Sequence, residues 1–321
     1  MTVRFGIIGL GIIAARFATV LNTVPGVQLT AVASSDPAKA AAFAEKFGAP
    51  KAYDNYLDLI RDSEVDVIYI GLTHNFHYEV TKLCLNLDKP VLCEKPFVTR
   101  QKDAVELAEL AKARKVLLME AMWTRCIPTF QKAKQWVHSG RIGAVKLIEA
   151  SFCFNTPFNP EHRLFNPKLA GGSLFDAGVY PIEFTTGILA ENPSSVKGVA
   201  NLCQTGVDDF AAMVMRFESG ALATLSSGLT AITERNARIY GPAGHIVVYN
   251  FLGPRKCELY DNAHQLVECF EADFQDGFIY QIEHFANLYR NHKTESDLVP
   301  LADTIACAGI FDELLRQWGL E

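Results

Sequence analysis

The sequence lacks paired cysteines and long hydrophobic segments. Eight cysteines occur among 321 residues, none of them in a CxxC pair, and most lie inside apolar segments such as Val91-Leu92-Cys93. Scattered thiols of this kind are typical of a reducing compartment and argue against a disulfide framework. The apolar stretch from Phe5 to Ala15 is interrupted by glycines, which fits a turn better than a leader peptide, and no segment is long enough to cross a bilayer. We therefore expect a cytoplasmic protein with no membrane partner.

Clusters of basic charge are also missing. The chain has 30 Lys and Arg against 36 Asp and Glu, a formal net charge of −6, and the two signs are interspersed along its length. A nucleic-acid-binding protein normally carries a clustered Lys/Arg face, so we exclude nucleic acid as a main partner. Apolar residues make up 49% of the chain and charged residues 21%, which is ordinary globular composition.

The hydrophobic pattern predicts two domains, as expected for a chain of this length. In the first part, short apolar segments alternate with helical patterns, which indicates βαβ units around a parallel sheet. In the second part, period-two strands follow one another at hairpin spacing, and helical patterns return at Tyr280–Arg290 and Leu301–Trp318. The sequence thus predicts an α/β fold, with a doubly wound Rossmann domain at 1–121 and an α+β domain at 122–321 built on a large open, mostly antiparallel sheet.

A glycine-rich turn follows the first predicted strand, Arg4–Gly9. The segment Gly9-Leu10-Gly11-Ile12-Ile13-Ala14 matches a GxGxxA form of the dinucleotide fingerprint and leads into a helical pattern. Gly9 permits the tight turn, Gly11 lets the backbone approach a pyrophosphate, and Ala14 allows the helix to pack closely on the strand. The N–H groups at the helix start, at Ile12 and Ile13, face the anion. A glycine turn without a ligand is the alternative, but the strand before it and the helix after it favour a cofactor.

The end of the second predicted strand favours NADP. An Asp or Glu there would hydrogen-bond the 2′-hydroxyl of NAD, whereas this sequence has Ser34 and Ser35, whose hydroxyls can donate to a 2′-phosphate. Lys39, one turn into the next helix, either adds positive charge or is an ordinary solvated side chain. Asp36 precedes Pro37 and has the character of a helix N-cap. NADP is therefore the expected cofactor, with NAD as the second choice.

Lys95 follows a predicted strand at the carboxyl edge of the sheet, where ligands of open α/β folds bind. Its ammonium group can hydrogen-bond a substrate oxygen and stabilise a neighbouring deprotonated acid. The alternative is an exposed loop lysine paired with Glu94, and spacing alone favours that alternative.

Four motifs in this order resemble the Gfo/Idh/MocA oxidoreductase family over nearly the whole chain. They are the GxGxxA turn, Thr73-His74-Asn75-Phe76-His77, Glu94-Lys95-Pro96, and Gly171-Gly172-Ser173-Leu174-Phe175-Asp176-Ala177-Gly178-Val179-Tyr180-Pro181. Closer similarity is to the branch of dimeric dihydrodiol dehydrogenases and NADP-dependent D-xylose dehydrogenases, and it lies in Leu92–Phe97, Leu118–Arg125 and Thr205–Asp209.

This resemblance implies that nicotinamide and substrate meet at a cleft between the two domains. It brings Lys95, Asp176 and Tyr180 into the active site; many family members have His at the position of Tyr180, and the dihydrodiol branch has Tyr. It also implies a set of cofactor-side residues, which are Thr73, His74, His77, Glu94, Lys95, Trp123 and Arg125. For Trp123, packing in the core is an equally good interpretation. No metal site is expected, because no third ligand accompanies His74 and His77.

The pair Asp176 and Tyr180 shares one face if the segment is helical, although Gly178 weakens that prediction. A tyrosine with an ordinary pKa of about 10 is a poor base at neutral pH, and a nearby cation such as Lys95 favours its ionised form. We expect Tyr180 to take the hydroxyl proton, Lys95 to polarise the oxygen and Asp176 to orient the substrate. A half-buried core tyrosine is the alternative.

These observations predict an NADP-dependent dehydrogenase acting on a secondary hydroxyl of a sugar, cyclic polyol or trans-dihydrodiol. The alternatives are a reductase of another carbonyl or conjugated bond on the same scaffold, and a non-catalytic regulator that senses the dinucleotide. The family commonly pairs subunits through its open sheet, so the resemblance also implies a homodimer through the C-terminal sheet.

Overall fold

The computed structural model describes residues 1–320 and divides the chain into two compact units. Unit 1 contains residues 1–98, 102–122 and 276–304, and unit 2 contains residues 99–101, 123–275 and the chain from 305 onward. The expected division into 1–121 and 122–321 differs from these units in one main respect: residues 276–304 return to unit 1.

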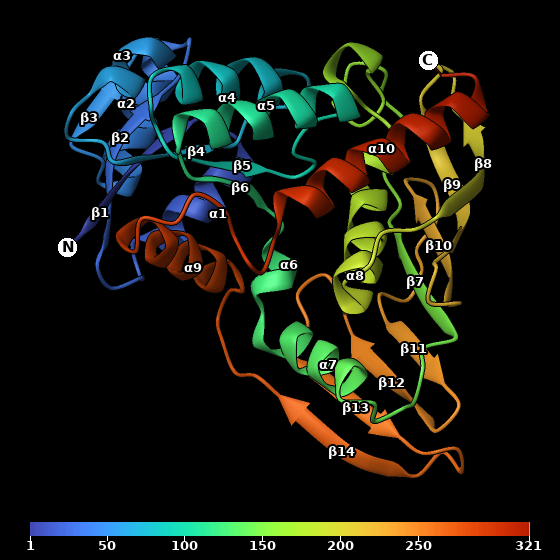
Figure 1. Ribbon diagram of the computed structural model, residues 1–321. Coiled ribbons are helices and arrows are strands. Elements are labelled where there is room, and N and C mark those ends of the chain that lie inside the picture. Colours follow the sequence, from blue (N-terminus) through green and yellow to red (C-terminus); the bar gives the residue numbers. More distant parts are fainter. Residues whose placement is uncertain (321) are drawn as a thin grey trace. The chain divides into compact units, whose positions relative to one another are not determined.

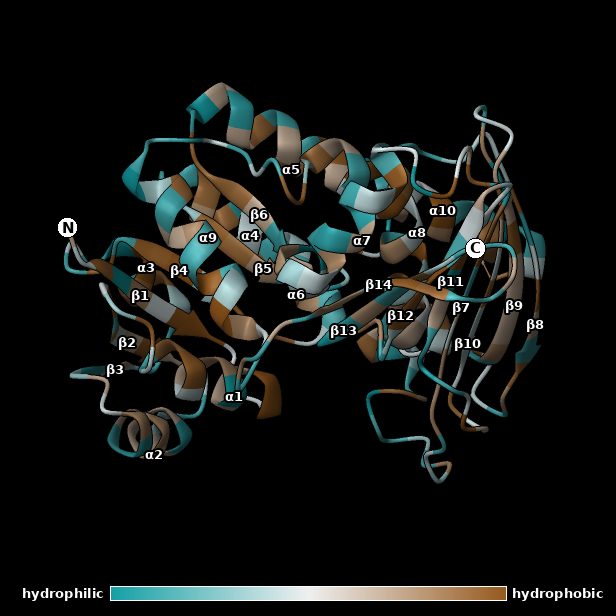
Figure 2. Cartoon of the chain, turned by 90° about the horizontal axis from the view of Figure 1, so that it is seen from below, coloured by the Kyte–Doolittle hydropathy of each residue, from teal (hydrophilic) through white to brown (hydrophobic). Residues whose placement is uncertain are grey.

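A six-stranded parallel sheet forms the centre of unit 1, with the strand order β3-β2-β1-β4-β5-β6 of a doubly wound dinucleotide fold. Every residue of β4, β5 and β6 is buried, and the strands are largely brown in Figure 2, as a sheet covered on both faces requires. The strands are β1 (Val3–Ile8), β2 (Val27–Ala33), β3 (Lys51–Tyr53), β4 (Val67–Ile70), β5 (Val91–Glu94) and β6 (Leu118–Ala121).

Helices cover both faces of this sheet, with α4 and α5 on one side and α1 and α9 on the other (Figure 1). They are α1 (Ile12–Leu21), α2 (Pro37–Phe47), α3 (Tyr56–Arg61), α4 (His77–Asn86), α5 (Gln101–Arg114) and α9 (Phe278–Arg290). The α9 rings of Phe285 and Phe278 pack against Phe5 of β1 and Phe17 of α1, with centroids 6.2 and 6.5 Å apart. This aromatic packing explains why the chain returns to unit 1.

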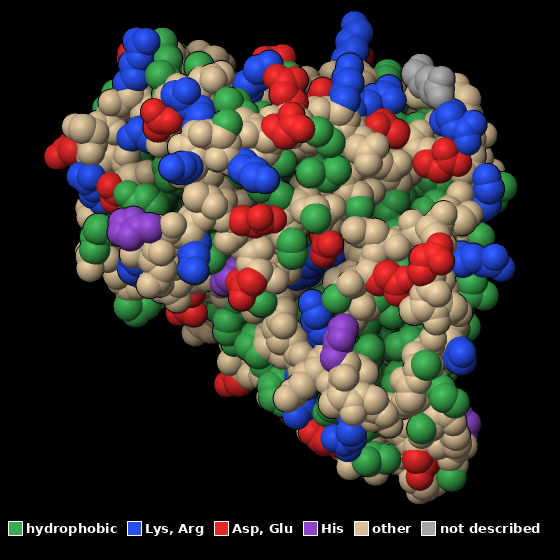
Figure 3. Space-filling model, viewed as in Figure 1, with side chains coloured by type: hydrophobic (Ala, Val, Ile, Leu, Met, Phe, Trp, Pro, Cys, Tyr) green, Lys and Arg blue, Asp and Glu red, His purple; other side chains and the backbone are tan. Residues whose placement is uncertain are grey.

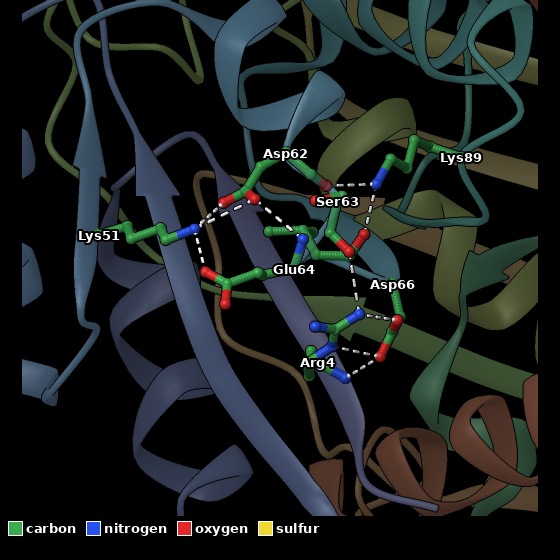
Figure 4. A network of polar contacts seen from close by, with 8 residues as sticks. Arg4, Lys51, Asp62, Ser63, Glu64, Asp66 and Lys89 are labelled. Atoms are coloured by element: carbon green, nitrogen blue, oxygen red, sulfur yellow. Dashed lines mark hydrogen bonds and ion pairs between the residues drawn. The ribbon is translucent and has the colours of Figure 1, made fainter.

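A network of ion pairs fixes the amino ends of the strands in unit 1 (Figure 4). Arg4 at the start of β1 binds Asp66 before β4, with 2.8 Å between Nη2 and Oδ1. Lys51 at the start of β3 binds the Asp62 carboxylate at 2.9 Å, and Lys89 before β5 donates to the Asp62 carbonyl at 2.7 Å. The network therefore lies at the sheet edge opposite the carboxyl ends, where ligands of this fold bind.

Unit 2 is built on an eight-stranded sheet of order β14-β13-β12-β11-β7-β10-β9-β8. Only β7 and β10 pair in parallel, so the prediction of a mostly antiparallel sheet is confirmed. The strands are β7 (Leu147–Cys153), β8 (Ser195–Leu202), β9 (Asp208–Arg216), β10 (Leu222–Gly228), β11 (Ala237–Gly241), β12 (Gly244–Tyr249), β13 (Lys256–Tyr260) and β14 (Leu266–Glu271).

Helices of unit 2 pack on one face of this sheet, α7 on β12 to β14 and α8 on β7 and β10. A π-helical turn, Leu174–Gly178, leads directly into α8. The helices are α6 (Trp123–Cys126), α7 (Pro128–His138), α8 (Val179–Leu189) and α10 (Leu301–Trp318), the last of which begins in unit 1. Side chains on the opposite face include Val199, Val214 and Leu222, which are 73%, 51% and 47% exposed.

Charges of both signs are mixed on the molecular surface. In Figure 3 blue and red side chains lie interspersed, and no broad patch of one sign is visible on the face drawn. None of the helices within residues 1–320 has the length and apolar content needed to span a membrane.

Candidate active site

The glycine turn after β1 has the geometry that the fingerprint predicts. Gly9 has a φ of +87°, and a Cβ there would lie 2.8 Å from the Leu72 backbone nitrogen, so only glycine fits the crossing of the two loops. A Cβ on Gly11 would instead meet open space. Helix α1 starts at Ile12 without a side-chain cap, and Ile12 is 93% exposed. Uncapped N–H groups beside open space fit a bound pyrophosphate.

Ala14 completes the turn by allowing close packing. It is fully buried, and a Cβ built on Gly71 would lie 3.4 Å from the Ala14 Cβ. A larger side chain at position 14 would push α1 away from the strands, and the N–H groups of Ile13 and its neighbours would move with it.

The carboxyl end of β2 presents serines and no free acid. The Asp36 carboxylate accepts hydrogen bonds from the backbone N–H of Ala38 and Lys39 at 3.0 and 3.2 Å, so Asp36 is the N-cap of α2, as predicted. Ser34 is buried and its hydroxyl accepts a hydrogen bond from Asp36 N–H, whereas Ser35 and Lys39 are exposed. Two exposed groups that can donate to a 2′-phosphate therefore lie at this edge.

His77 joins the loop after β4 to the loop after β5. The side chain is fully buried, with Nδ1 2.9 Å from the Pro96 carbonyl oxygen and Nε2 3.1 Å from that of Leu72. Burial lowers the pKa of His77 below its ordinary value, and a neutral ring donates from only one nitrogen at a time. Thr73 and His74, which are partly exposed, lie on the turn before it. The contact of these residues with a cofactor stays a prediction, and the visible role of His77 is to connect two loops.

The loop that carries Lys95 is held by buried carboxylates on both sides. Glu94, only 4% exposed, accepts hydrogen bonds from the Tyr69 hydroxyl at 2.7 Å and from Lys95 N–H at 3.2 Å, and its burial raises its pKa. Glu120, 1% exposed, accepts a hydrogen bond from Phe97 N–H at 3.0 Å. These contacts fix the backbone on either side of Lys95, whose own side chain is half-buried.

Tyr69 and Glu120 were not among the expected site residues. Both lie in short apolar strands that predict ordinary core positions. Tyr69 stacks on Phe17 with 3.6 Å between ring centroids, and Glu120 also accepts a hydrogen bond from Thr304 at 2.9 Å. The sequence feature that could have identified Glu120 is an acidic residue within a buried strand, because a carboxylate there needs hydrogen-bond partners.

In unit 2, the phenolic oxygen of Tyr180 lies among aromatic side chains. Trp123 Nε1 donates a hydrogen bond to it at 3.1 Å, and Phe152 packs edge-on with ring centroids 5.5 Å apart. Trp123 and Tyr180 are 7% and 9% exposed. The phenolic oxygen of Tyr180 is thus held by one N–H donor in a largely buried, aromatic site.

Arg125 lies beneath α8. Its guanidinium donates to the Glu183 carbonyl oxygen at 3.0 Å and to the Thr186 hydroxyl at 2.7 Å, and it forms an ion pair with the Glu183 carboxylate at 2.8 Å. Arg125 and Glu183 are 1% and 0% exposed. A Cβ on Gly187 would come within 2.8 Å of Arg125 Nε, so this helix position has to be small. Cofactor contact by Arg125 stays a prediction. Its contacts with Glu183 and Thr186 connect α6 to α8.

Asp176 lies on the π-helical turn and binds a residue that the sequence did not single out. Its Oδ1 is 2.9 Å from Arg163 Nη1, on the loop that precedes Gly171. The Asp176 side chain is 11% exposed and that of Arg163 is 45% exposed, so the guanidinium has open space beside it. Arg163 is thereby placed next to a predicted catalytic carboxylate.

Family models match both parts of the chain. Residues 3–122 match the oxidoreductase family with an NAD-binding Rossmann fold, and residues 130–247 match the GFO/IDH/MocA C-terminal domain. The chain belongs to the GFO/IDH/MocA oxidoreductase family. The resemblance inferred from its motifs is therefore confirmed, and unit 1 is an NAD(P)-binding Rossmann domain.

Family members with curated names resemble the chain over its full length. Trans-1,2-dihydrobenzene-1,2-diol dehydrogenase of Xenopus laevis is 34% identical over 330 residues, which cover 100% of this chain and 99% of that protein. The human protein of the same name is 30% identical and covers 100% of this chain and 98% of its own length. The chain is thus similar to dehydrogenases that act on CH–OH groups.

Solved structures of the family share the fold. The 3-ketoreductase KijD10 from Actinomadura kijaniata, crystallised with NADP and TDP-benzene, has a TM-score of 0.87 at 25% identity and covers 99% of this chain and 98% of its own. Levoglucosan dehydrogenase, in complex with NADH and levoglucosan, has a TM-score of 0.90 at 19% identity over 99% of this chain and 98% of its own.

The ion pair beneath α8 gives a stability prediction. Glu183→Gln leaves the Arg125 guanidinium buried without a counter-charge, so we expect a loss of about 3–5 kcal/mol in the free energy of unfolding, measured by urea denaturation. Glu313→Gln is the matched control, because Glu313 pairs with Arg316 at the surface and should change stability by less than about 1 kcal/mol. Equal losses in the two variants would contradict this account.

Proposed function

We propose that the chain is an NADP-preferring dehydrogenase that oxidises a secondary hydroxyl of a sugar, cyclic polyol or trans-dihydrodiol, with Tyr180 as the general base. The observation that carries the proposal is the hydrogen bond from Trp123 Nε1 to Tyr180 Oη, on the same helical segment as Asp176. The names of the relatives, which act on a diol, and of the fold neighbours, which act on sugars, support this substrate class.

Each residue has a role that follows from its chemistry. Tyr180 Oη takes the proton of the substrate hydroxyl, and the Trp123 N–H stabilises the phenolate that precedes this transfer. Lys95 polarises the same substrate oxygen, and Asp176, held by Arg163, orients the substrate. When bound, the nicotinamide supplies the acceptor for the hydride that leaves the carbinol carbon.

The aromatic surroundings of Tyr180 support a ring-shaped substrate. Phe152 contacts both Tyr180 and Phe154, with centroid distances of 5.5 Å in each case, and Arg235 lies 5.0 Å from the Phe152 ring. The C–H face of a sugar or cyclic diol packs well on such rings, while its hydroxyls reach polar groups at the edge. Phe152 and Phe154 are only partly buried and so remain available for contact.

Replacing Tyr180 with Phe tests the catalytic role. We expect kcat to fall by about 10²–10⁴-fold, since general acid–base help is worth that much, while the Kd for NADPH stays unchanged. Turnover is measured with NADP⁺ and a panel of aldoses and cyclic diols. Tyr56→Phe on α3 is the control and should keep native turnover. Native kcat in the Tyr180→Phe enzyme would remove the assignment.

Replacing Ser35 with Asp tests the cofactor preference. A carboxylate at this exposed position repels a 2′-phosphate, so NADPH binding should weaken by about tenfold or more while NADH binding is spared. Fluorescence titration measures both constants. Ser35→Ala, which removes only a donor, should cause a smaller loss. An equal effect on NADPH and NADH would show that Ser35 does not contact the 2′-phosphate.

We also propose that the open face of the unit 2 sheet pairs with a second copy of the chain. A hollow of about 810 Å³ lies on strands β7 to β10 of this face, and exposed Val199 and Val214 border it. The same patch on two copies can form an isologous interface. The lining also contains polar side chains such as Glu149 and Arg238, so the proposed interface is of mixed polarity.

Sedimentation equilibrium tests this pairing. The native chain should sediment as a dimer and Val214→Asp as a monomer, because a carboxylate in the centre of the interface would be desolvated without a partner. Ala42→Asp is the control, since Ala42 is exposed on α2 of unit 1 and lies outside this sheet. A native chain that is monomeric at every concentration tested would exclude the interface.

A further inference from the structure

Gly172 and Asp208 belong to two separate sequence motifs that meet in unit 2. Gly172 has a φ of +117°, and a Cβ built on it would lie 2.3 Å from Asp208 Oδ1. A side chain at position 172 would therefore collide with the carboxylate and would also strain the backbone. The glycine is required because the carboxylate occupies the adjacent space.

The Asp208 carboxylate binds the beginning of the helical segment that follows. Its Oδ2 accepts hydrogen bonds from the Ser173 hydroxyl and from Leu174 N–H, both at 2.7 Å. The Ser173 hydroxyl is also 2.9 Å from the Ser227 hydroxyl on β10. Asp208, Ser173 and Ser227 are all at most 2% exposed. The first residues of the segment are thus attached to β9 and β10 by hydrogen bonds that water does not reach.

This attachment at Leu174 lies two residues before Asp176 and six before Tyr180, the predicted catalytic side chains. Leu174 opens the π-helical turn that contains Asp176, and α8 with Tyr180 continues from it. Gly178, at the junction, would place a Cβ 3.2 Å from both Leu174 Cδ1 and Ser227 Oγ, so the junction itself is closely packed on β10. A shift of Leu174 would consequently move Asp176 and Tyr180 together.

Folding stability alone does not explain a carboxylate at this position. Burial raises the pKa of Asp208 to about 7, with nearby Asp209 adding to the rise and the two hydrogen bonds opposing it. An acid whose pKa is raised on folding destabilises the folded chain once it is ionised. An apolar side chain could fill the same volume without that cost, but it would accept neither the Leu174 N–H nor the Ser173 hydroxyl, so the feature to explain is the acceptor that fixes these two groups.

We propose that Asp208 is a positioning residue, which fixes the rotation and height of the segment Leu174–Leu189 and thereby sets Asp176 and Tyr180 against the substrate. The proposal rests on the function assigned above to Tyr180. It also explains why Gly172, which makes room for this carboxylate, belongs to the same structural unit as Asp208. Asp208 itself touches neither substrate nor cofactor in this role.

Two replacements of Asp208 test whether its hydrogen bonds position the segment: Asp208→Ala removes them, and Asp208→Asn keeps them in a neutral side chain of similar shape. Asp208→Ala removes both hydrogen bonds, and because a displacement near 1 Å can cost about 10²-fold in rate, kcat should fall by about that factor with KM and the NADPH Kd unchanged. Asp208→Asn keeps a carbonyl oxygen that accepts both hydrogen bonds and should restore most of kcat. Asp209→Ala, at the next position of β9, is the matched control and should keep native kcat.

The deuterium isotope effect gives a second measurement for the same variants. A substrate deuterated at the carbinol carbon should show a larger isotope effect on kcat in Asp208→Ala than in the native enzyme, because misplacement slows the hydride step itself. Tyr180→Phe is run in parallel. If Tyr180→Phe loses activity while Asp208→Ala keeps native kcat and isotope effect, the positioning proposal fails alone. If Tyr180→Phe keeps native kcat, the proposed function fails.

Discussion

Arg125 and Glu183 face each other where solvent is excluded, at 2.8 Å and with exposed fractions of 1% and 0%. Removing two charges from water costs several kcal/mol per ion, and their attraction offsets this only when further hydrogen bonds satisfy the remaining donors. The Glu183 carbonyl and the Thr186 hydroxyl supply those bonds. Because the pair joins α6 to α8, it holds Trp123, two residues before Arg125, against Tyr180, three residues before Glu183. The hydrogen bond at the phenolic oxygen therefore depends on charges buried behind it.

Buried polar side chains also hold the predicted functional residue of unit 1, Lys95. The buried side chains of Glu94, Glu120 and His77 contact the backbone of the loop that carries it, at Lys95 N–H, Phe97 N–H and the Pro96 carbonyl. Buried polar groups need partners, and here the partners are the peptide groups that flank one partly exposed lysine. In both units, the predicted catalytic side chain is thus placed largely by groups that solvent cannot reach.

The sequence predicted those features of the fold that arise from local geometry. Asp36 is the N-cap of α2, as predicted, because N-caps are chosen by a few residue types. Gly48 ends the helix in the left-handed conformation that favours glycine. Strand β3 has only three partly exposed residues and no hydrophobic pattern, so it went unpredicted. The return of α9 to unit 1 depends on aromatic packing between residues more than 250 positions apart, which periodicity does not encode.

The sequence predicted those candidate site residues that belong to recognisable motifs. It did not predict the residues that hold them in place. Glu183 is the lone charged residue in the segment Val179–Leu189, and that contrast signals a buried partner without identifying it as Arg125. Arg163 lies in a loop of no recognisable pattern, and only the folded chain brings it to Asp176.

The segment Leu174–Leu189 shows why polar contacts are needed in such a place. All residues from Leu174 to Ile188 are buried, so the segment has no solvent-facing side to set its rotation. Apolar contacts are non-directional and would tolerate several rotations or small translations along the sheet. Hydrogen bonds and ion pairs have narrow geometric limits. Asp208 binds the start of the segment and Arg125 binds its middle, on either side of Tyr180. Two directional contacts determine both the rotation and the height of a helix, so the tyrosine between them has one position.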